Sequence, residues 1–251
     1  MRKVGGKPDE ADISQGIYGL FGAWSQNGQI LDGDWPIIFG KSCCRTIVPC
    51  PEATSLRSRH ANNWVREGLS ELRSHGVLRP KMRLLGRGLE SPTSDRCGRP
   101  TWYFLMTNFL SIESPLRCGE HYLPIPLYRV PPTDEAGHLD VLRWQSEWKC
   151  CDQLQMLCGS AERWATRQIS DPHSPLSKGG RKICSVIEDL SGVPTYYYLY
   201  RGGGRSAADE RKRPCPSCGK KWLLHEPLHD IIDFKCDRCR LISNIAWSVR
   251  G

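Results

Sequence analysis

The sequence lacks any long apolar segment. Its apolar runs, such as the one at Ile37–Phe39, are far shorter than the roughly 20 residues that a helix needs to cross a bilayer. We also expect no secretory leader, because the start turns acidic by Asp9 and Glu10 where an apolar stretch should follow. With 39% hydrophobic and 25% charged residues, the 251-residue chain belongs to the ordinary globular class. We therefore expect a cytoplasmic protein without a membrane span.

The common signatures of enzymes are missing too. The sequence has no nucleophile elbow and no H-E-x-x-H motif, and the glycines at 202–204 lack the strand-to-helix setting of a phosphate loop. Paired acids occur at Glu188-Asp189 and at Glu147 with Asp152, where solvated helix faces or ion pairs explain them. We predict that the protein is not an enzyme.

Cysteine, in contrast, is abundant. Thirteen cysteines, an odd number, in a chain without an export signal do not indicate a disulfide framework, because a reducing compartment keeps such bridges open. Two C-x2-C pairs, Cys215 with Cys218 and Cys236 with Cys239, are separated by 17 residues. This spacing predicts a structural zinc site with four sulphur ligands and no open position. The short segment that contains these cysteines has too small an apolar core to fold without a metal ion. Metal binding would therefore contribute much of its folding free energy.

A second group of candidate ligands is less regular. Cys118 and His121 form a C-x2-H pair in a proline-rich segment, and Cys151 and Cys158 lie two helical turns apart in a helical pattern. Together these four side chains are a candidate second metal site, so the expected cofactor is one zinc ion or two. The alternative is that they are buried small side chains, since free cysteine is often buried. Core filling is also the expected role of six further cysteines: Cys43, Cys44, Cys50, Cys97, Cys150 and Cys184.

The rest of the chain mixes helical and strand patterns. A long helical stretch over residues 139–168 is interrupted near Gly159, and Ser174-Pro175 begins another helix that Gly192 ends. An aromatic strand follows at Thr195–Tyr200. We predict an α+β fold with three parts: a larger N-terminal α+β domain over 1–201, of which about 1–16 are loose, a flexible linker over 202–213 and a zinc ribbon over 214–251.

The charge of the chain, +8, favours a polyanionic partner. Residues 202–251 hold ten Lys and Arg against six Asp and Glu, whereas residues 1–201 hold 25 against 21, so the tail is the more basic part per residue. We therefore predict that the ribbon binds nucleic acid, DNA or RNA, through basic side chains that contact phosphate and one tryptophan that stacks on a base. These residues are Lys220, Lys221, Lys235, Arg238 and Arg240, with Trp222 for stacking.

Two other functions remain open on the sequence. The ribbon could instead dock a protein partner through its aromatic residues Trp222, Phe234 and Trp247. A third alternative is an enzyme whose site is assembled in the large domain from the second Cys/His group. No feature of the sequence indicates a membrane partner.

Several motifs carry a resemblance to a known family. The segments Asp152–Met156, Ser174–Arg181, Pro194–Arg201 and Cys236–Trp247 resemble a bacterial Zn-ribbon-containing family of unknown function, for which nucleic-acid binding is a suggested role. The match extends from about Gly28 to Trp247. It implies a C-terminal ribbon whose ligands correspond to the four cysteines of the two C-x2-C pairs, and it implies a nucleic-acid partner.

Overall fold

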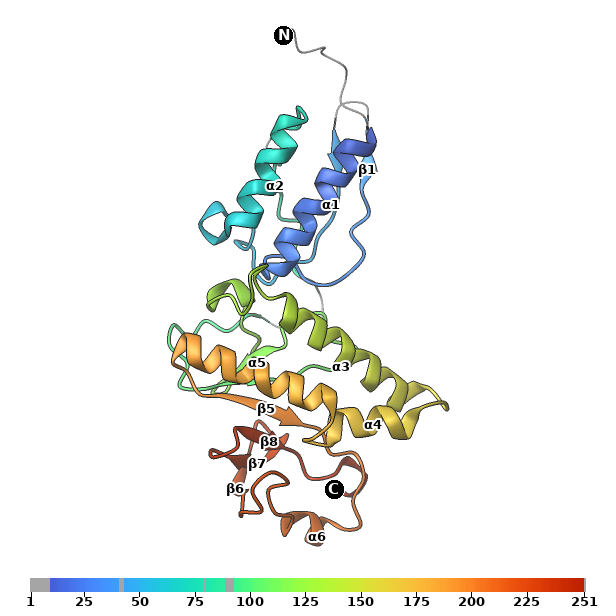
Figure 1. Ribbon diagram of the computed structural model, residues 1–251, viewed down its shortest axis with the longest axis vertical. Coiled ribbons are helices and arrows are strands. Elements are labelled where there is room, and N and C mark those ends of the chain that lie inside the picture. The colour runs from blue at the N-terminus through green and yellow to red at the C-terminus, as the bar shows by residue number, and fades with distance from the viewer. Residues whose placement is uncertain (1–9, 41–42, 79, 89–92, 251) are drawn as a thin grey trace.

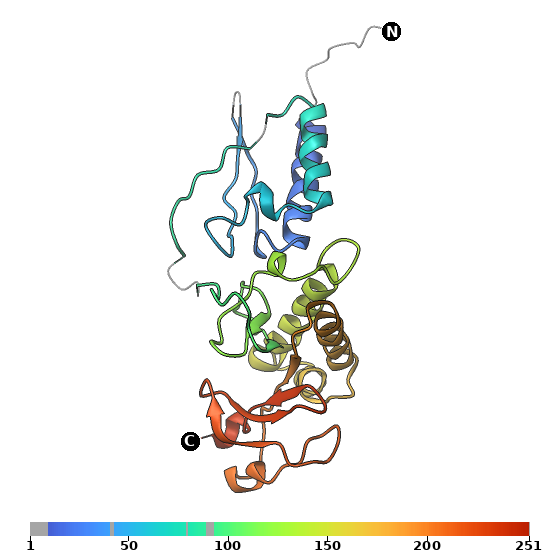
Figure 2. The same cartoon turned by 90° about the vertical axis from the view of Figure 1, so that its left-hand side faces the viewer.

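The molecule is elongated, and its secondary structure falls into three parts along the long axis (Figures 1 and 2). A computed structural model describes residues 10–40, 43–78, 80–88 and 93–250. We call residues 10–78 the N-terminal unit, residues 93–201 the central unit and residues 214–250 the ribbon. None of the helices in these described ranges is long and apolar enough to cross a membrane.

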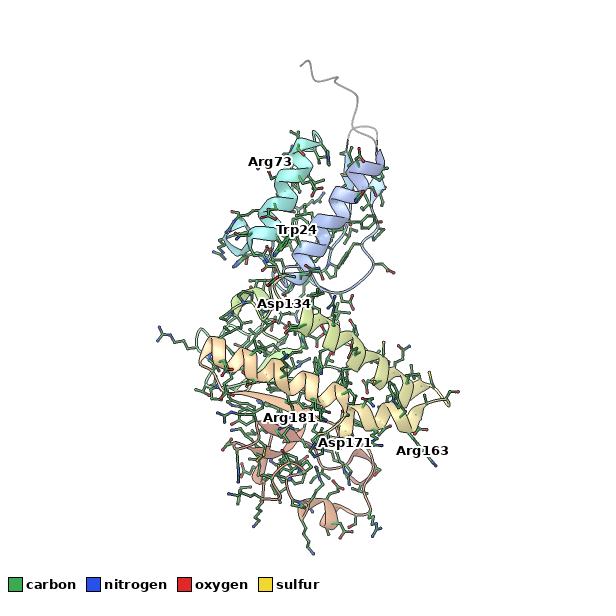
Figure 3. The ribbon with its side chains drawn as sticks, in the orientation of Figure 1. Trp24, Arg73, Asp134, Arg163, Asp171 and Arg181 are labelled. Atoms are coloured by element: carbon green, nitrogen blue, oxygen red, sulfur yellow. The ribbon has the colours of Figure 1, made fainter. Side chains whose placement is uncertain are left out.

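The N-terminal unit is built on two packed helices, α1 (Glu10–Gln26) and α2 (Asn63–Ser74), with two short strands, β1 (Ile38–Phe39) and β2 (Cys44–Arg45). Its apolar core includes Leu20, Trp24 and Val65, and Trp24 lies between the two helices (Figure 3). This core is separate from that of the central unit, so the predicted domain over 1–201 contains two cores. The prediction of a loose start is wrong for residues 10–16, which are helical; residues 1–9 lie outside the described ranges.

The central unit contains three helices that the sequence marks clearly. They are α3 (Leu139–Leu157), α4 (Glu162–Ser170) and α5 (Pro175–Ser191). The break between α3 and α4 spans Gly159, as predicted. The α5 helix begins where Ser174 Oγ accepts a hydrogen bond from the Ser177 N–H, and it ends at Gly192, whose φ of 71° suits glycine.

One mixed sheet of six strands joins the central unit to the ribbon. Its strands are β3 (Tyr103–Leu105), β4 (Leu116–Cys118), β5 (Thr195–Leu199), β6 (Leu223–Leu228), β7 (Ile232–Cys236) and β8 (Leu241–Ser243). Their order is β4-β3-β5-β8-β7-β6, and the β3–β5 and β5–β8 pairs are parallel. The predicted α+β fold is therefore confirmed. The ribbon strands, however, continue the sheet of the central unit through β8, which pairs with β5 at Tyr197↔Leu241.

The β5 strand is buried on both faces. Tyr197 packs edge-on against Trp144 of α3, with ring centroids 5.9 Å apart, in the core that α3 and α5 cover. On the opposite face, Tyr196 and Tyr198 belong to a second cluster, and the Tyr198 hydroxyl hydrogen bonds to Asn244 Oδ1 at 2.9 Å. These tyrosines therefore form the centre of the sheet.

The segment predicted as a flexible linker, residues 202–213, is ordered and packed. It contains the short helix α6 (Ala207–Arg211), and Glu210 within it is only 4% exposed. The Glu210 carboxylate makes ion pairs with Arg201 at 2.7 Å and with Arg213 at 3.2 Å. The prediction of a flexible linker is wrong because this carboxylate is buried between two cations that compensate its charge.

Candidate metal centre and basic surface

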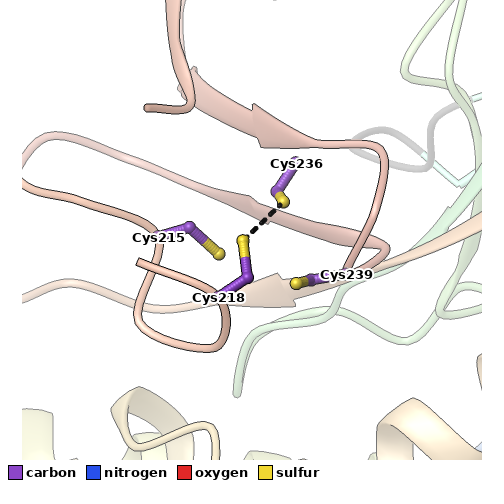
Figure 4. A group of neighbouring side chains, drawn as sticks. All are labelled: Cys215, Cys218, Cys236 and Cys239. Atoms are coloured by element: carbon purple, nitrogen blue, oxygen red, sulfur yellow. Dashed lines mark hydrogen bonds between the residues drawn. The ribbon is translucent and has the colours of Figure 1, made fainter. Parts of the chain in front are cut away.

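Four cysteine sulphurs meet at one end of the ribbon (Figure 4). Cys215 and Cys218 lie on the turn before β6, while Cys236 ends β7 and Cys239 lies in the turn before β8. All four Sγ atoms are within 4.8 Å of one another, and those of Cys218 and Cys236 are 3.7 Å apart. A tetrahedral zinc site with bonds of about 2.3 Å has sulphur–sulphur edges of about 3.8 Å. The tetrad is therefore a group that could bind a metal ion, as its spacing predicts.

The backbone of the first C-x2-C turn favours the thiolate form of Cys218. The Cys215 C=O accepts a hydrogen bond from the Gly219 N–H at 2.8 Å, and Gly219 has a φ of 69°, which suits a residue without a Cβ atom. The backbone N–H of Lys220 lowers the pKa of Cys218 to about 7. One sulphur is thus ready to ionise near neutral pH.

Burial acts against ionisation of two other sulphurs. Desolvation raises the pKa of Cys236 to about 12 and also raises that of Cys215. Several thiolates cannot coexist at such short distances unless a cation neutralises them. A divalent metal ion supplies that charge, so the electrostatics of the tetrad fit a metal-bound state better than a set of free thiolates.

Trp222 is a core residue of the ribbon. It is 3% exposed, its ring lies 5.0 Å from that of Phe234, and its Nε1–H donates to the Arg213 carbonyl at 3.0 Å. The predicted stacking of Trp222 on a base is wrong for this fold because the ring has no open face. Of the three aromatic residues considered for protein docking, Phe234 is buried as well, and only Trp247 is exposed, at 44%.

The five predicted phosphate contacts divide into two groups. Lys220, Lys221 and Arg238 are exposed, and within the described ranges none of them forms an ion pair. Lys235 lies 3.0 Å from an Asp237 carboxylate oxygen and covers the rings of Trp102 and Tyr196.

Arg240 belongs with Lys235 in the second group. It donates from Nη2 to Glu188 Oε1 at 2.7 Å and from Nε to Glu188 Oε2 at 2.9 Å. This pairing raises the pKa of the Arg240 guanidinium, chiefly through the hydrogen bond to Glu188. Arg240 and Lys235 are therefore occupied within the fold, and three of the five predicted contacts are free.

The predicted second metal site does not form as a set of four. Cys118 Sγ and His121 Nδ1 are 3.6 Å apart, but Cys151 is buried inside α3 and Cys158 is exposed just after it. In the part of the chain that the structure describes, His121 belongs to two close donor groups, one with Asp95 and Cys118 and the other with Cys97 and Glu120. The helix keeps its two cysteines apart because seven residues rise about 10 Å.

Three family models match the chain, and each is described as a domain of unknown function. They are DUF8589 over residues 6–86, DUF2310 over residues 97–200 and DUF8594 over residues 204–249. Their limits approximate the N-terminal unit, the central unit and the ribbon.

Two relatives come from Haemophilus influenzae, strain Rd, and both carry the description "Uncharacterized protein". One is 39% identical over 229 residues, which cover 90% of this chain and 88% of the relative. The other is 42% identical over 173 residues, or 69% of this chain and 85% of the relative. No solved structure matches the chain.

Proposed function

The chain belongs to the same protein family as the Haemophilus influenzae protein that is 39% identical to it over 90% of its length, and we propose that it is a zinc-ribbon protein that binds nucleic acid. The observation that carries this proposal is the position of three free cations, Lys220, Lys221 and Arg238, on the two turns that hold the cysteine tetrad. Each cation is within three residues of a cysteine of the tetrad.

Zinc is the metal that fits the tetrad. Four cysteine sulphurs in a tetrahedral arrangement are typical of structural zinc sites, and they leave no position for a substrate or a reactive water. The ion would neutralise the thiolates and tie the segment before β6 to the β7–β8 connection. Its role in this proposal is to hold the two turns in place, without chemistry of its own.

Phosphate is the ligand that suits the three cations. They are exposed on short turns that the cysteine ligands hold in position. The backbone of these turns therefore loses little conformational freedom when phosphate binds. Lys221 precedes the buried Trp222, and Arg238 lies between two ligands of the tetrad, so both backbones are anchored. Three contacts to phosphate give modest, sequence-independent and salt-dependent affinity for nucleic acid.

Protein docking is the competing outcome. The exposed Trp247 is the one aromatic anchor left to it of the three considered, and the Arg250 guanidinium already lies 5.2 Å from the centre of that ring. Interfaces between proteins usually centre on several buried aromatic or arginine anchors. The charge on the turns therefore favours a polyanion over an apolar partner.

The test uses full-length, zinc-loaded protein and its Lys220→Ala/Lys221→Ala variant. Binding to single-stranded and duplex oligonucleotides is measured across a salt series by fluorescence anisotropy. We expect the variant to bind more weakly and the slope of log K against log salt to fall by up to about two units, since each lost phosphate contact removes roughly 0.9.

A matched control removes the same charge elsewhere. Lys178→Ala/Lys182→Ala changes two exposed lysines one turn apart on α5, far from the tetrad in the sequence, and should leave the slope unchanged. Equal effects of the two double variants would mean that only net charge matters. Wild-type protein that binds neither DNA nor RNA at low salt would contradict the proposal.

A further inference from the structure

A second group of metal-binding side chains surrounds the turn after β4, in the central unit. Cys118 Sγ lies 3.6 Å from His121 Nδ1 and 3.8 Å from Glu120 Oε2. The same Glu120 oxygen lies 3.7 Å from Cys97 Sγ, on the segment before β3. Cys97, Glu120 and His121 offer donor atoms that are all within 4.8 Å of one another. Asp95, Cys118 and His121 form a second group of this kind, so both sulphurs have His121 and the Glu120 carboxylate as neighbours.

The turn that carries Cys118 and His121 has the backbone form of the ribbon turns. The residue after the second ligand has a positive φ in all three cases: 69° at Gly219, 51° at Arg240 and 64° at Tyr122. The hydrogen bond from the Tyr122 N–H to the Cys118 C=O, 2.9 Å long, matches the bond from Gly219 to Cys215. A tyrosine at positive φ is strained, and such strain persists where the surroundings impose it.

Backbone N–H groups are aimed at the sulphur in the same way. Those of Glu120 and His121 hydrogen bond to Cys118, as those of Ser217 and Cys218 do to Cys215. This arrangement offers the first cysteine of the turn the donors that stabilise a metal-bound thiolate.

Gly119 shows how tightly this turn is packed. A Cβ atom at Gly119 would lie 2.0 Å from the Trp102 ring, so only glycine lets the turn approach Trp102. Across the turn, His229 of the β6–β7 connection lies 2.8 Å, through Nε2, from the Gly119 carbonyl. The turn is therefore also a contact between the central unit and the ribbon.

Hydrogen bonds to neighbouring residues fix the orientation of the Asp95 and Glu120 carboxylates. Asp95 is buried, and its Oδ1 accepts a hydrogen bond from the Cys97 N–H while its Oδ2 lies 3.0 Å from His121 Nδ1. Glu120 Oε1 accepts a hydrogen bond from Thr101 Oγ1 at 2.8 Å, which leaves Oε2 facing the two sulphurs. The bond from the Cys97 N–H to Asp95 and that from Thr101 to Glu120 are of the kind that outer-shell groups make to metal ligands.

We propose that Cys97, Cys118, His121 and Glu120 bind a second divalent cation of the zinc type, with Asp95 orienting Cys97. Tetrahedral zinc with ordinary bond lengths places sulphur about 3.6 Å from nitrogen and about 3.5 Å from oxygen. The observed separations of 3.6, 3.7 and 3.8 Å are close to these edges. A mixed sulphur, nitrogen and oxygen donor set favours zinc over calcium or magnesium, which take oxygen.

The ion would act as a clip. It would tie the segment that carries Cys97 to the end of β4, and so add to the contact of Thr101 with Glu120 and to the backbone hydrogen bond from the Gly119 N–H to the Trp102 carbonyl. Because Gly119 contacts His229, the clip would also steady the surface against which the ribbon packs. This site shares no ligand with the ribbon tetrad. The proposal does not depend on whether the protein binds nucleic acid.

The experiment counts zinc per chain in full-length protein that is purified under reducing conditions and dialysed. We expect two zinc ions in the wild type and one in His121→Ala, whose half-exposed side chain can be removed without opening the core. Cys97→Ser should also retain one. Cys158→Ser, which changes an exposed cysteine outside the group, is the matched control and should retain two.

Two further measurements separate this site from the ribbon. Cys236→Ser should keep the second ion while it loses the first, and cobalt substitution in that variant should give weaker sulphur-to-metal absorption than a four-sulphur site. Asp95→Asn should keep the ion but lower its affinity about 10- to 100-fold, as expected for an outer-shell group.

The results that would overturn the proposal are specific. They are a wild type with one zinc per chain, a His121→Ala variant that still holds two, or a disulfide between Cys97 and Cys118 in protein purified under reducing conditions. Because Cys236→Ser removes only the ribbon ion, a failure of this proposal and a failure of the ribbon assignment predict different numbers of zinc ions per chain.

Discussion

The N-terminal unit and the ribbon are both small, yet they join the central unit in different ways. The N-terminal unit has its own helical core, and backbone contact with the central unit is made where the His138 N–H donates to the Gln26 carbonyl at 2.8 Å. The ribbon instead extends the central sheet, because β8 pairs along β5.

The reason lies in the backbone. A helix satisfies its own N–H and C=O groups, whereas a strand leaves one edge free for another strand. A substitution that unfolds the ribbon should therefore also destabilise the central unit. A substitution that destabilises the N-terminal unit should leave the central unit folded.

The largest effect is expected from Cys236→Ser. Loss of this ligand should release the ribbon zinc, unfold β7 and β8, and expose the edge of β5, because metal binding supplies much of the folding free energy of such a unit. Zinc content and amide hydrogen exchange at β5 measure the two consequences. Cys150→Ser, an exposed cysteine of α3, should change neither. Undiminished zinc would refute the ligand assignment, and unchanged protection of β5 would refute the coupling.

Glu210→Ala tests whether the ordered segment 202–213 holds the ribbon in place. The change leaves Arg213, which is partly buried over the Trp222 and Phe234 rings, without its carboxylate partner. Breaking such a buried pair should lower the free energy of unfolding by about 3 to 5 kcal/mol. Urea denaturation measures the loss, and Glu226→Ala, at an exposed carboxylate, should cost little. A small effect at Glu210 would restore the description of this segment as a passive linker.

Leu20→Ala tests whether the N-terminal unit unfolds independently of the central unit. Leu20 is fully buried in the N-terminal core, so its truncation should cost about 2 to 5 kcal/mol locally. Hydrogen exchange should accelerate in α1 and α2 and stay unchanged in α5. Gln15→Ala, on the exposed face of α1, is the control. Faster exchange in α5 would show that the two cores unfold together.

The smallest effect is expected at the contact between Arg240 and Glu188, which joins the ribbon to α5. The pair is partly exposed, so its coupling energy should be about 1 kcal/mol and should fall as salt rises. A double-mutant cycle with Arg240→Ala and Glu188→Gln measures it at low and high ionic strength. A coupling near zero at low salt would leave strand pairing as the main link between ribbon and central unit.

Local signals in the sequence predicted local structure well. The helix start at Ser174-Pro175 and the break at Gly159 are confirmed, since each depends on a few neighbouring residues. The cysteine tetrad was predictable because each C-x2-C turn carries two ligands within four residues.

The errors share one cause. Residues 202–213 were predicted to be a flexible linker and Trp222 to stack on a base, because burial depends on partners that are distant in the sequence. For Cys97, the one available signal was weak: the triplet Arg-Cys-Gly occurs at residues 96–98 and again at 117–119.

The sequence by itself determined the mixed α+β character, the helices of the central unit and the four cysteines that could bind a metal. Only the tertiary structure decided that β8 completes the central sheet, that Lys220, Lys221 and Arg238 are free while Lys235 and Arg240 are paired, and that Cys97 lies close to His121 and Glu120. Turns and helix ends follow from short-range chemistry that neighbouring residues encode. Strand pairing, burial and the meeting of donors from separate segments depend on long-range contacts, which exist only once the chain has folded.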